Sequence, residues 1–591
     1  MIKSRLERLR KCMVGKGVQA FYIHGSDPHI SEYLPERWHT RAFISGFTGS
    51  YGWLAITLNE AVLWTDSRYF IQAENELKGS GIQMLKARLP ETPDVPGWLI
   101  PRIPAGSKVG FNSECFPFSL YQNMLTQFSQ TGTELVDTGD LLNEIWDNRP
   151  ASPKAAIFEH ELKYTGESRV EKINRIRVGM SEKGADWHIL TALDDIAWTF
   201  NLRENDIEFN PVFLSYALIG KQQAILFVDL KKIPDDLKNK LQNEGIQLRE
   251  YPLIFSFLKE IKISEKIYID PDKTNCAIVT SIPASCKIIE GLSMPCLLKA
   301  QKNTTEIANI RHAMKKDGVA LLEFWHWLEN AVGKEKITEY DLVLKLNQFR
   351  QKQPKFKGDS FYPIIGYREH GAVVHLHVAE GNALEIEKSG ILLFDSGGHY
   401  LDGTTDITRT IALGIPTDQQ KSDFTLTLKG VIALSKAIFP EHTRGCHLDI
   451  LARKALWENG LNYGHGTSHG VGFFLNVHEG PVSIRPDLND QTIKEGMVLS
   501  NEPGLYREGE YGIRTENMMV CVEKQTTAYS KFLGFETLTL FPIDTRMIAI
   551  ELLLVDEIQW INAYHQQVWE KLSSSVSGEL KIFLQKKTNI L

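Results

Sequence analysis

Residues 394–410, FDSGGHYLDGTTDITRT, decide how the carboxyl-terminal half of the chain folds. The stretch continues an apolar run, GILLF, which is typical of a buried strand and carries Asp395 into the core. A second acid, Asp406, follows eleven residues later amid Thr and Ile, again in strand-like sequence. Because a lone buried carboxylate is costly unless it is paired or binds a metal, the stretch predicts a functional site rather than a pair of turn-capping residues.

The same pattern returns about a hundred residues later. The apolar run GMVLSNEPG supplies Glu502, and a glycine-rich loop then leads to Glu516, fourteen residues further on. Two such strand pairs, related by a pseudo-twofold axis, would point four carboxylates into one cavity. Those carboxylates would repel one another and would have strongly raised pKa values unless cations neutralised them.

Histidines lie between the two acid pairs and narrow the choice of metal. The segment GHGTSHGVGFFLNVHEGP contains His465, His469 and His478, with glycines close to His469. Oxygen-rich sites suit Mg, Mn, Co or Zn, and one imidazole shifts the preference toward Mn, Co, Zn or Fe. The sequence therefore predicts a divalent metal site built from both halves of this region.

The amino-terminal half contains an internal repeat. Residues 9–23, LRKCMVGKGVQAFYI, and residues 176–190, IRVGMSEKGADWHIL, share an apolar helix stripe, an arginine, a glycine stop and a following strand, at a constant offset of 167. We interpret them as two copies of one α/β domain; the alternative is a chance match, since helix–glycine–strand is common.

Turn-rich segments suggest the domain boundaries. The linker NRPASPKAA (148–156) separates the two copies, and a second boundary lies near residue 300. We predict domains at 1–150, 151–300 and 301–591, the last with a helical extension from about residue 547. The fold class is α/β (α+β).

Composition excludes several classes of function. The formal net charge of −7 and the pI near 6.2 give no basic footprint, so we expect no nucleic-acid partner. The seven cysteines are scattered without a CxxC pair, which argues against a disulfide framework and indicates a reducing compartment, hence the cytoplasm. No apolar run approaches the ~20 residues that span a bilayer, and no signal peptide precedes the first helix, so we expect no membrane partner.

Six motifs together resemble the pita-bread metallopeptidases: GAVVH, DGTTDITRT, HGTSHGVG, LNVHEGP, NEPG and GIRTEN. Over essentially its whole length the chain is similar to the long, three-domain cytosolic Xaa-Pro aminopeptidases, and WTDSRYF and NPVFLSYALIG extend the similarity into the amino-terminal half. The resemblance implies two creatinase-like α/β domains followed by a pita-bread catalytic domain.

The resemblance also implies a role for each site residue. Two divalent metal ions, with Mn²⁺ favoured over Co²⁺ or Zn²⁺, would be held by Asp395, Asp406, His469, Glu502 and Glu516, with Asp406 and Glu516 bridging. His375 and His478 would stabilise the reacting carbonyl and move protons, and Glu502 would also carry a proton. Arg514 would hold a neighbouring carboxylate by charge-assisted hydrogen bonds.

The implied reaction is hydrolysis of the first peptide bond of peptides with proline at the second position. A hydroxide that bridges the metals would attack the carbonyl, and the first residue would be released. The family forms homodimers, so the resemblance implies a dimer. Alternatives are a prolidase that cuts only dipeptides and a non-catalytic peptide-binding or protein-binding member of the fold.

The remaining polar residues of these motifs receive structural assignments. We interpret His465 as a structural histidine near the metal ligand, and His370, His377 and His399 as surface or pocket-rim residues. Arg68, in WTDSRYF, is assigned an ion-pair or domain-packing role.

Overall fold

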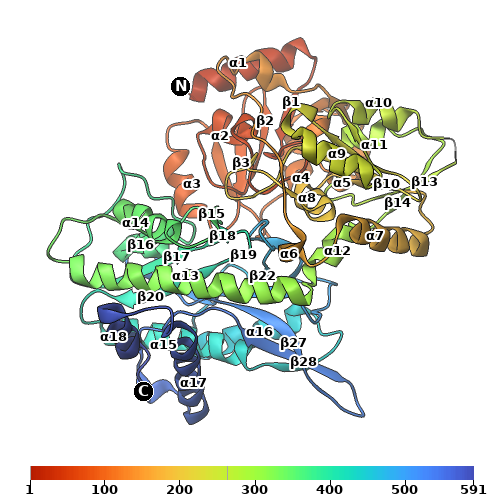
Figure 1. Cartoon of the computed structure of the whole chain (residues 1–591). Coiled ribbons are helices and arrows are strands. Elements are labelled where there is room, and N and C mark those ends of the chain that lie inside the picture. The colour runs from red at the N-terminus through yellow and green to blue at the C-terminus, as the bar shows by residue number, and fades with distance from the viewer. Residues whose placement is uncertain (1, 263) are drawn as a thin grey trace. The chain divides into compact units, whose positions relative to one another are not determined.

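A computed structural model describes residues 2–262 and 264–591 of the chain (Figure 1). The chain divides into two compact units, one formed by Met1–Glu161 with Glu167–Leu297 and the other by Leu162–Gly166 with Leu298–Leu591. In the part of the chain so described, no helix is both long enough and apolar enough to cross a membrane.

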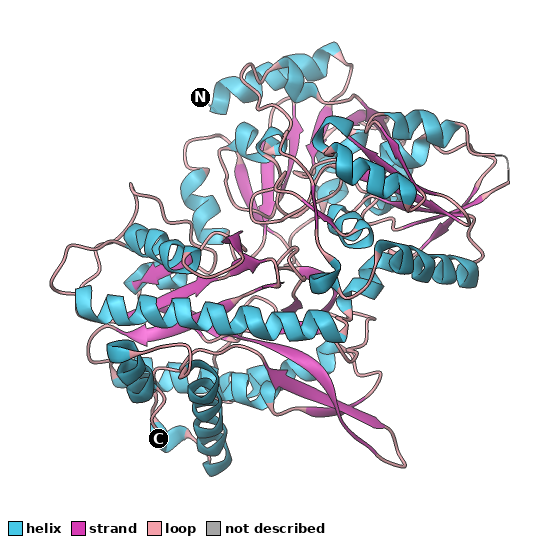
Figure 2. Cartoon of the chain, viewed as in Figure 1, coloured by secondary structure: helices cyan, strands magenta, loops and turns pink. Residues whose placement is uncertain are grey.

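The first unit contains two six-stranded mixed sheets of identical topology (Figure 2). Their strand orders are β4-β3-β2-β1-β5-β6 and β12-β11-β10-β8-β13-β14. The first sheet consists of β1 (Ala20–Ile23), β2 (Trp53–Thr57), β3 (Ala61–Thr65), β4 (Gln83–Lys86), β5 (Lys108–Phe111) and β6 (Glu134–Asp137). The second consists of β8 (Trp187–Leu190), β10 (Ser215–Gly220), β11 (Ala224–Val228), β12 (Ile246–Arg249), β13 (Lys266–Ile269) and β14 (Lys287–Glu290).

Helices accompany both sheets in the same order along the chain. Those of the first copy are α1 (Ile2–Gly15), α2 (Thr40–Ser45), α3 (Phe70–Glu76), α4 (Val95–Leu99) and α5 (Phe118–Phe128). Those of the second are α7 (Arg169–Lys183), α8 (Leu193–Phe200), α9 (Asp235–Asn243), α10 (Leu253–Lys259) and α11 (Cys276–Thr280).

The duplication predicted from the sequence is confirmed, down to single hydrogen bonds. The Nε of Arg10 donates to the carbonyl of Thr57 at 3.0 Å, and Thr57 pairs with the first residue of β1. The Nε of Arg177 donates to the carbonyl of Gly220 at 3.1 Å, and Gly220 pairs with the first residue of β8. The repeated arginine therefore ties the first helix of each copy to the same point of its sheet.

The second unit begins with a small helix, α6 (Leu162–Thr165), and the long helix α13 (Thr304–Ala331), whose start is fixed by a capping box between Asn303 and Glu306. Further helices are α14 (Glu339–Gln351), α15 (Asp418–Ser435), α16 (Gly445–Trp457), α17 (Val555–Leu572) and α18 (Gly578–Lys587). The helices pack against strands, and buried apolar residues of both form the main core of this unit.

Two sheets of this unit carry the acidic motifs. One has the order β16-β17-β20, with β16 (Ile364–Tyr367), β17 (Ile391–Ser396) and β20 (Ile407–Ala412). The other has the order β21-β28-β27-β24-β22-β23, with β21 (Ile438–Pro440), β22 (Ser468–Gly470), β23 (Glu479–Ile484), β24 (Val498–Asn501), β27 (Asn517–Thr526) and β28 (Lys531–Thr537). The antiparallel pair β17·β20 in one sheet corresponds to the antiparallel pair β24·β27 in the other, as the repeated acid pattern predicts.

Smaller sheets complete the unit. They are β15 (Phe356–Asp359) with β18 (Gly398–Tyr400) and β19 (Gly403–Thr404), and the hairpin of β25 (Gly504–Arg507) with β26 (Tyr511–Arg514).

The carboxyl-terminal helix starts later than the sequence pattern predicts. Instead of a helix from about residue 547, two short 3₁₀ turns, Thr545–Met547 and Ile550–Leu552, precede α17, which begins at Val555. The reason is local, because the carboxylate of Glu557 accepts a hydrogen bond from the backbone N–H of Leu554 at 2.7 Å and so caps the helix there. From that point α17 buries one face, which includes Ile561, Tyr564 and Val568.

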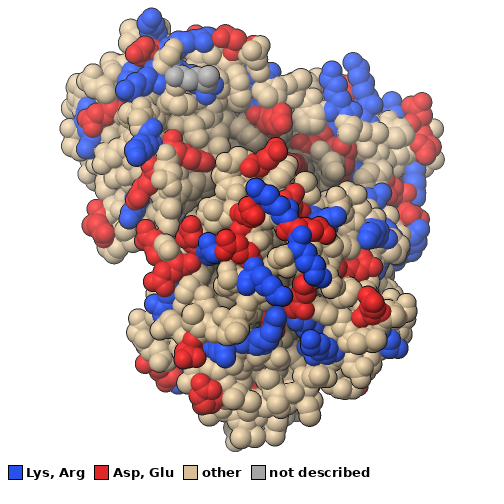
Figure 3. Space-filling view, turned by 90° about the vertical axis from the view of Figure 1, so that its left-hand side faces the viewer, with Lys and Arg blue, Asp and Glu red and all other residues tan. Residues whose placement is uncertain are grey.

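On the face shown in Figure 3, positively and negatively charged side chains are interspersed rather than gathered by sign.

Candidate metal centre

The β17·β20 pair places the first two acids. Every residue of β17 is buried, and Asp395 near its end pairs in register with Thr408 of β20. Asp406 lies immediately before β20, and both acids are buried, with exposed fractions of 7% and 4%. The hydrophobic run that makes β17 a core strand thus carries a carboxylate into the core, as the sequence predicts.

The second sheet supplies the other two acids from equivalent places. Glu502 follows β24 directly, and Glu516 lies in the short link between β26 and β27. The N–H of Glu502 donates to the carbonyl of Thr467 at 2.9 Å, and the N–H of Glu516 donates to the carbonyl of Thr408 at 3.0 Å. The second bond joins Glu516, which directly precedes β27 of the six-stranded sheet, to β20 of the three-stranded sheet.

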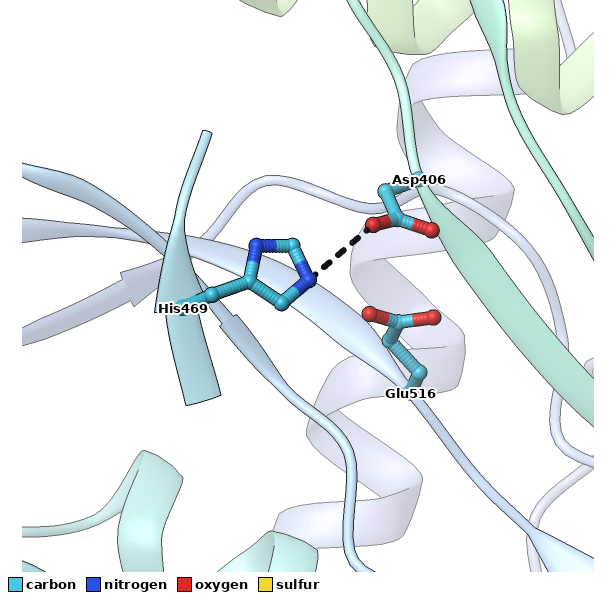
Figure 4. A group of neighbouring side chains, drawn as sticks. All are labelled: Asp406, His469 and Glu516. Carbon is cyan, nitrogen blue, oxygen red and sulfur yellow. Dashed lines mark ion pairs between the residues drawn. The ribbon is translucent and has the colours of Figure 1, made fainter. Parts of the chain in front are cut away.

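His469, in the middle of β22, faces these acids (Figure 4). Its Nε2 lies 3.4 Å from Asp406 Oδ2 and 3.5 Å from Glu502 Oε1. One potential ligand atom from each of Asp406, His469 and Glu516 lies within 4.8 Å of the others, which is close enough for a single cation to contact all three.

The backbone around His469 orients the imidazole. Its Nδ1 lies 2.8 Å from the carbonyl oxygen of Gly470, so Nδ1 carries the hydrogen and Nε2 is the atom available to a metal. Gly470 has to be glycine, because a Cβ there would lie 2.4 Å from the carbonyl oxygen of Glu479 on the neighbouring strand β23.

Arg514 connects three groups of the site. Its guanidinium donates to Asp395 Oδ2 at 2.6 Å, to the hydroxyl of Tyr506 at 2.6 Å and to Thr408 Oγ1 at 3.1 Å. Thr408 in turn donates to Glu516 Oε2 at 3.0 Å. The buried guanidinium of Arg514 therefore fixes the carboxylate of Asp395 directly and that of Glu516 through Thr408.

The electrostatics of the cluster favour added positive charge. Burial, reinforced by the neighbouring carboxylates, raises the pKa of Glu516 well above its ordinary value and that of Glu502 to about 7. Burial likewise raises the pKa of Asp395, although Arg514 opposes the shift. For His469, burial alone would lower the pKa, but the hydrogen bond with Asp406 and the charge of Glu502 raise it to about 9.

Two carboxylate oxygens show where cations fit. Asp395 Oδ1 and Glu516 Oε1 are fully buried and have no hydrogen-bond partner among the described residues. A buried carboxylate oxygen without a donor is unfavourable in water-free surroundings, whereas divalent cations accept such oxygens as ligands. Four carboxylates and one imidazole nitrogen form a donor set that suits a borderline divalent ion.

The two further histidines expected at the site lie on neighbouring segments. The ring of His478 is 4.5 Å from that of His469, centroid to centroid, at 85°. His375 follows a 3₁₀ turn, Arg368–Ala372, in which Gly371 packs against Gly512 of β26. A Cβ on Gly512 would lie 1.7 Å from the carbonyl oxygen of Gly371, so the backbones of this segment and of the strand that carries Arg514 are in direct contact here.

The structure agrees with the predicted positions of three other histidines and differs from that of a fourth. His465 contacts the hydroxyl of Tyr506 at 2.8 Å, which is the structural role expected of it. His370 is half-buried and bonds to Glu339 at 2.8 Å, and His377 is exposed and stacks on Tyr362. His399, expected at the surface or at a pocket rim, does not lie at the surface: it is only 4% exposed, and its Nδ1 lies 3.1 Å from Thr404 Oγ1.

Arg68 forms the ion pair that the sequence suggested. Its guanidinium binds Asp66 at 2.9 Å within the first unit and lies over the rings of Tyr51 and Tyr69.

Sequence reasoning missed two residues of the site, Thr408 and Tyr506. Thr408 could have been found, because it follows Asp406 at the strand period of two and so lies on the same face of β20. Tyr506 gave no such signal, since its contact with Arg514 depends on the hairpin register that pairs Gly504 with Arg514.

Family models match the chain in four consecutive segments. The creatinase/prolidase N-terminal domain matches twice, at residues 5–145 and 148–306. The model of metallopeptidase family M24 matches residues 308–523, and the C-terminal region of peptidase M24 matches residues 531–591. The fold class predicted from the sequence, two creatinase-like domains followed by a pita-bread domain, is thereby confirmed.

Relatives are similar over nearly the whole chain. Xaa-Pro aminopeptidase 1 of Dictyostelium discoideum is 39% identical, covering 97% of this chain and 93% of the relative. Xaa-Pro aminopeptidase ApepP of Drosophila melanogaster is also 39% identical, covering 97% and 96%. The crystal structure of X-prolyl aminopeptidase from Caenorhabditis elegans, described as a cytosolic enzyme with a di-nuclear active site, superposes with a TM-score of 0.96 at 31% identity and covers all of both chains.

Proposed function

The chain belongs to metallopeptidase family M24, and from that premise we propose that it is an Xaa-Pro aminopeptidase, which removes the first residue of a peptide whose second residue is proline. Full-length similarity to named Xaa-Pro aminopeptidases supports this function over that of a prolidase. The observation that carries the chemistry is the gathering of four acids and one imidazole from distant parts of the chain, namely Asp395, Asp406, His469, Glu502 and Glu516.

These five residues would hold two divalent cations, for which Mn²⁺ is the proposed metal. The donor set and the two buried carboxylate oxygens without partners fit cations of this kind. When bound, such a pair lowers the pKa of a shared water and polarises the carbonyl of the scissile bond.

Glu502 is the proposed proton carrier. Its side chain is 18% exposed, against 5% for Asp406, so it is open to a water molecule and a substrate with which it can exchange a proton. It takes up the proton that the attacking water loses and returns it to the leaving nitrogen. That return is required because the proline nitrogen is too basic to leave as an anion and departs only as a protonated, neutral secondary amine.

The remaining residues bind and orient. His478, beside His469, and His375 are proposed to donate hydrogen bonds to the oxygen that becomes negatively charged when the carbonyl is attacked. Arg514 keeps the Asp395 carboxylate in one position and favours its ionised form, because its guanidinium lies 2.6 Å from Oδ2.

The wider setting is also part of the proposal. Domains at 1–150, 151–300 and 301–591 would act together in a cytoplasmic homodimer. The C. elegans relative is described as cytosolic, and light scattering would detect the dimer as particles of twice the 67.1 kDa of the chain.

Peptide hydrolysis tests the proposal. Purified protein loaded with Mn²⁺ should release arginine from Arg-Pro-Pro and leave Arg-Ala-Pro intact. If the protein cleaves the dipeptide Arg-Pro but not Arg-Pro-Pro, it is a prolidase instead. No turnover of any of these peptides by protein with full metal content would reject an enzymatic function and favour a binding protein.

A further inference from the structure

Two residues of β20 hold Glu516 from three sides. The carbonyl of Thr408 accepts from the N–H of Glu516 at 3.0 Å, and Thr408 Oγ1 donates to Glu516 Oε2 at 3.0 Å. The guanidinium of Arg409 donates to the carbonyl oxygen of Glu516 through Nη1. Both backbone groups and the carboxylate of Glu516 therefore depend on the position of β20.

Arg409 is an unusual choice for this position. Its side chain is fully buried, and its hydrogen bonds with the described residues go to neutral oxygens rather than to a carboxylate. Its other partners are neutral oxygen atoms, contributed by the carbonyls of Thr408, Phe541 and Pro542, the side chain of Asn517 and the hydroxyl of Tyr564. A buried guanidinium is costly unless its donors are satisfied, so these acceptors determine how it is oriented.

Tyr564 is the partner that comes from the carboxyl-terminal helix. It lies on the buried face of α17 and its ring stacks on Trp560, with centroids 5.4 Å apart and an interplanar angle of 6°. Its hydroxyl accepts from Arg409 Nη2 at 2.8 Å and donates to the carbonyl of Phe541, also at 2.8 Å. The hydroxyl is thus one of three acceptors that hold Arg409 Nη2, together with Asn517 Oδ1 and the carbonyl of Phe541.

We propose that Tyr564 and Arg409 are positioning residues of the metal centre, through which the carboxyl-terminal helix α17 holds Glu516 in place. Tyr564 orients Arg409, and Arg409 orients the backbone of Glu516. This inference rests on the proposed role of Glu516 as a metal ligand. It gives the carboxyl-terminal region, to which the sequence alone assigned no chemistry, a part in metal binding.

The substitution Tyr564→Phe removes one hydroxyl and leaves the ring. Outer groups that orient metal ligands typically contribute about 10- to 100-fold to metal affinity, and we expect about a tenfold weaker affinity for Mn²⁺. Titration of the metal-free protein with Mn²⁺ by calorimetry measures this directly. If the protein hydrolyses Xaa-Pro peptides, kcat at limiting Mn²⁺ falls in parallel, KM stays unchanged and excess Mn²⁺ restores kcat.

Tyr367→Phe is the matched control. Tyr367 lies in the same buried core cluster, and its hydroxyl donates to the carbonyl of Ser389 at 3.1 Å, away from the acids. A purely structural effect would lower the stability of both variants and leave Mn²⁺ affinity equal to that of the unmodified protein. Equal Mn²⁺ affinity in Tyr564→Phe and Tyr367→Phe overturns the proposal.

Folding and function are controlled separately. Melting curves of the metal-free proteins show whether each variant folds. If Tyr564→Phe does not, Arg409→Lys takes its place, because an ammonium keeps the charge but cannot reach Glu516 and Tyr564 together; undiminished Mn²⁺ affinity in that variant overturns the proposal. Weaker Mn²⁺ binding in a protein that cleaves no Xaa-Pro peptide would support this inference and reject the proposed function.

Discussion

Replacement of Arg514 by lysine tests how the cluster is organised. The guanidinium makes three hydrogen bonds in three directions, to Asp395, Thr408 and Tyr506, and it is only 2% exposed. An ammonium on the shorter lysine chain keeps the positive charge but can reach only one of these groups with good geometry. The substitution therefore separates the effect of charge from the effect of geometry.

The expected magnitude follows from the bonds that are lost. A hydrogen bond with one charged partner contributes roughly 1.5–3 kcal/mol, so losing two costs about 3 kcal/mol at the lower end of that range. At about 1.4 kcal/mol for each factor of ten, this corresponds to about a 100-fold loss. Because Asp395 is a proposed metal ligand, we expect that loss in the affinity for Mn²⁺ and in kcat/KM measured at limiting Mn²⁺.

Arg507→Lys provides the comparison. Arg507 lies on the same hairpin and binds Asp423 through two hydrogen bonds of 2.6 and 3.0 Å. Its replacement should lower thermal stability without changing metal affinity. Calorimetric titration of both metal-free variants with Mn²⁺ decides the matter. If Arg514→Lys changes the affinity for Mn²⁺ by less than about twofold, the geometry of the guanidinium does not organise the metal ligands.

Three further predictions concern the acids themselves. Glu502→Gln keeps the shape of the side chain but cannot carry a proton, so kcat for Arg-Pro-Pro should fall by about 10²- to 10⁴-fold, and a loss under threefold would exclude the proton-carrier role. In the metal-free protein, burial raises the pKa of Glu502 from 4.5 to about 7, so its contribution to stability is fully present below about pH 4.5 and is lost as the pH rises through 7, by roughly 3 kcal/mol. Melting temperatures of the metal-free protein should therefore decline over that interval, more steeply than those of Glu502→Gln; identical slopes would contradict the assignment. Asp406→Ala removes a proposed bridge between the cations and should lower the bound metal, measured by elemental analysis, below two ions per chain, whereas an unchanged content would exclude bridging.

Periodic patterns in the sequence predicted the parts of the fold that local chemistry determines. The run GILLF is typical of a core strand, and β17 confirms that prediction. The arginine repeated at an offset of 167 marked two copies of one domain, which the paired contacts of Arg10 and Arg177 confirm. The carboxyl-terminal helix was placed too early because apolar residues continue on both sides of Leu554. The helix boundary is set instead by a single cap from Glu557, which periodicity does not reveal.

At the site, the sequence predicted acids and histidines but not the neutral groups that hold them. Asp406 stands out because a buried carboxylate is costly unless it is paired or binds a metal, whereas Thr408 gives only the signal of the strand period and Tyr506 gives none. Their contacts with Arg514 depend on how distant strands pair, and so does the contact of Tyr564 with Arg409. For His399 the sequence suggested exposure, because the residue is polar and lies in a turn-rich stretch, but in the structure it is only 4% exposed.

The most direct test of the account is a crystal structure of the protein grown with Mn²⁺, with an anomalous difference map calculated at a wavelength that identifies the metal. The account predicts two peaks enclosed by Asp395, Asp406, His469, Glu502 and Glu516. A map with no peak among these residues, or with peaks only elsewhere on the chain, would contradict it.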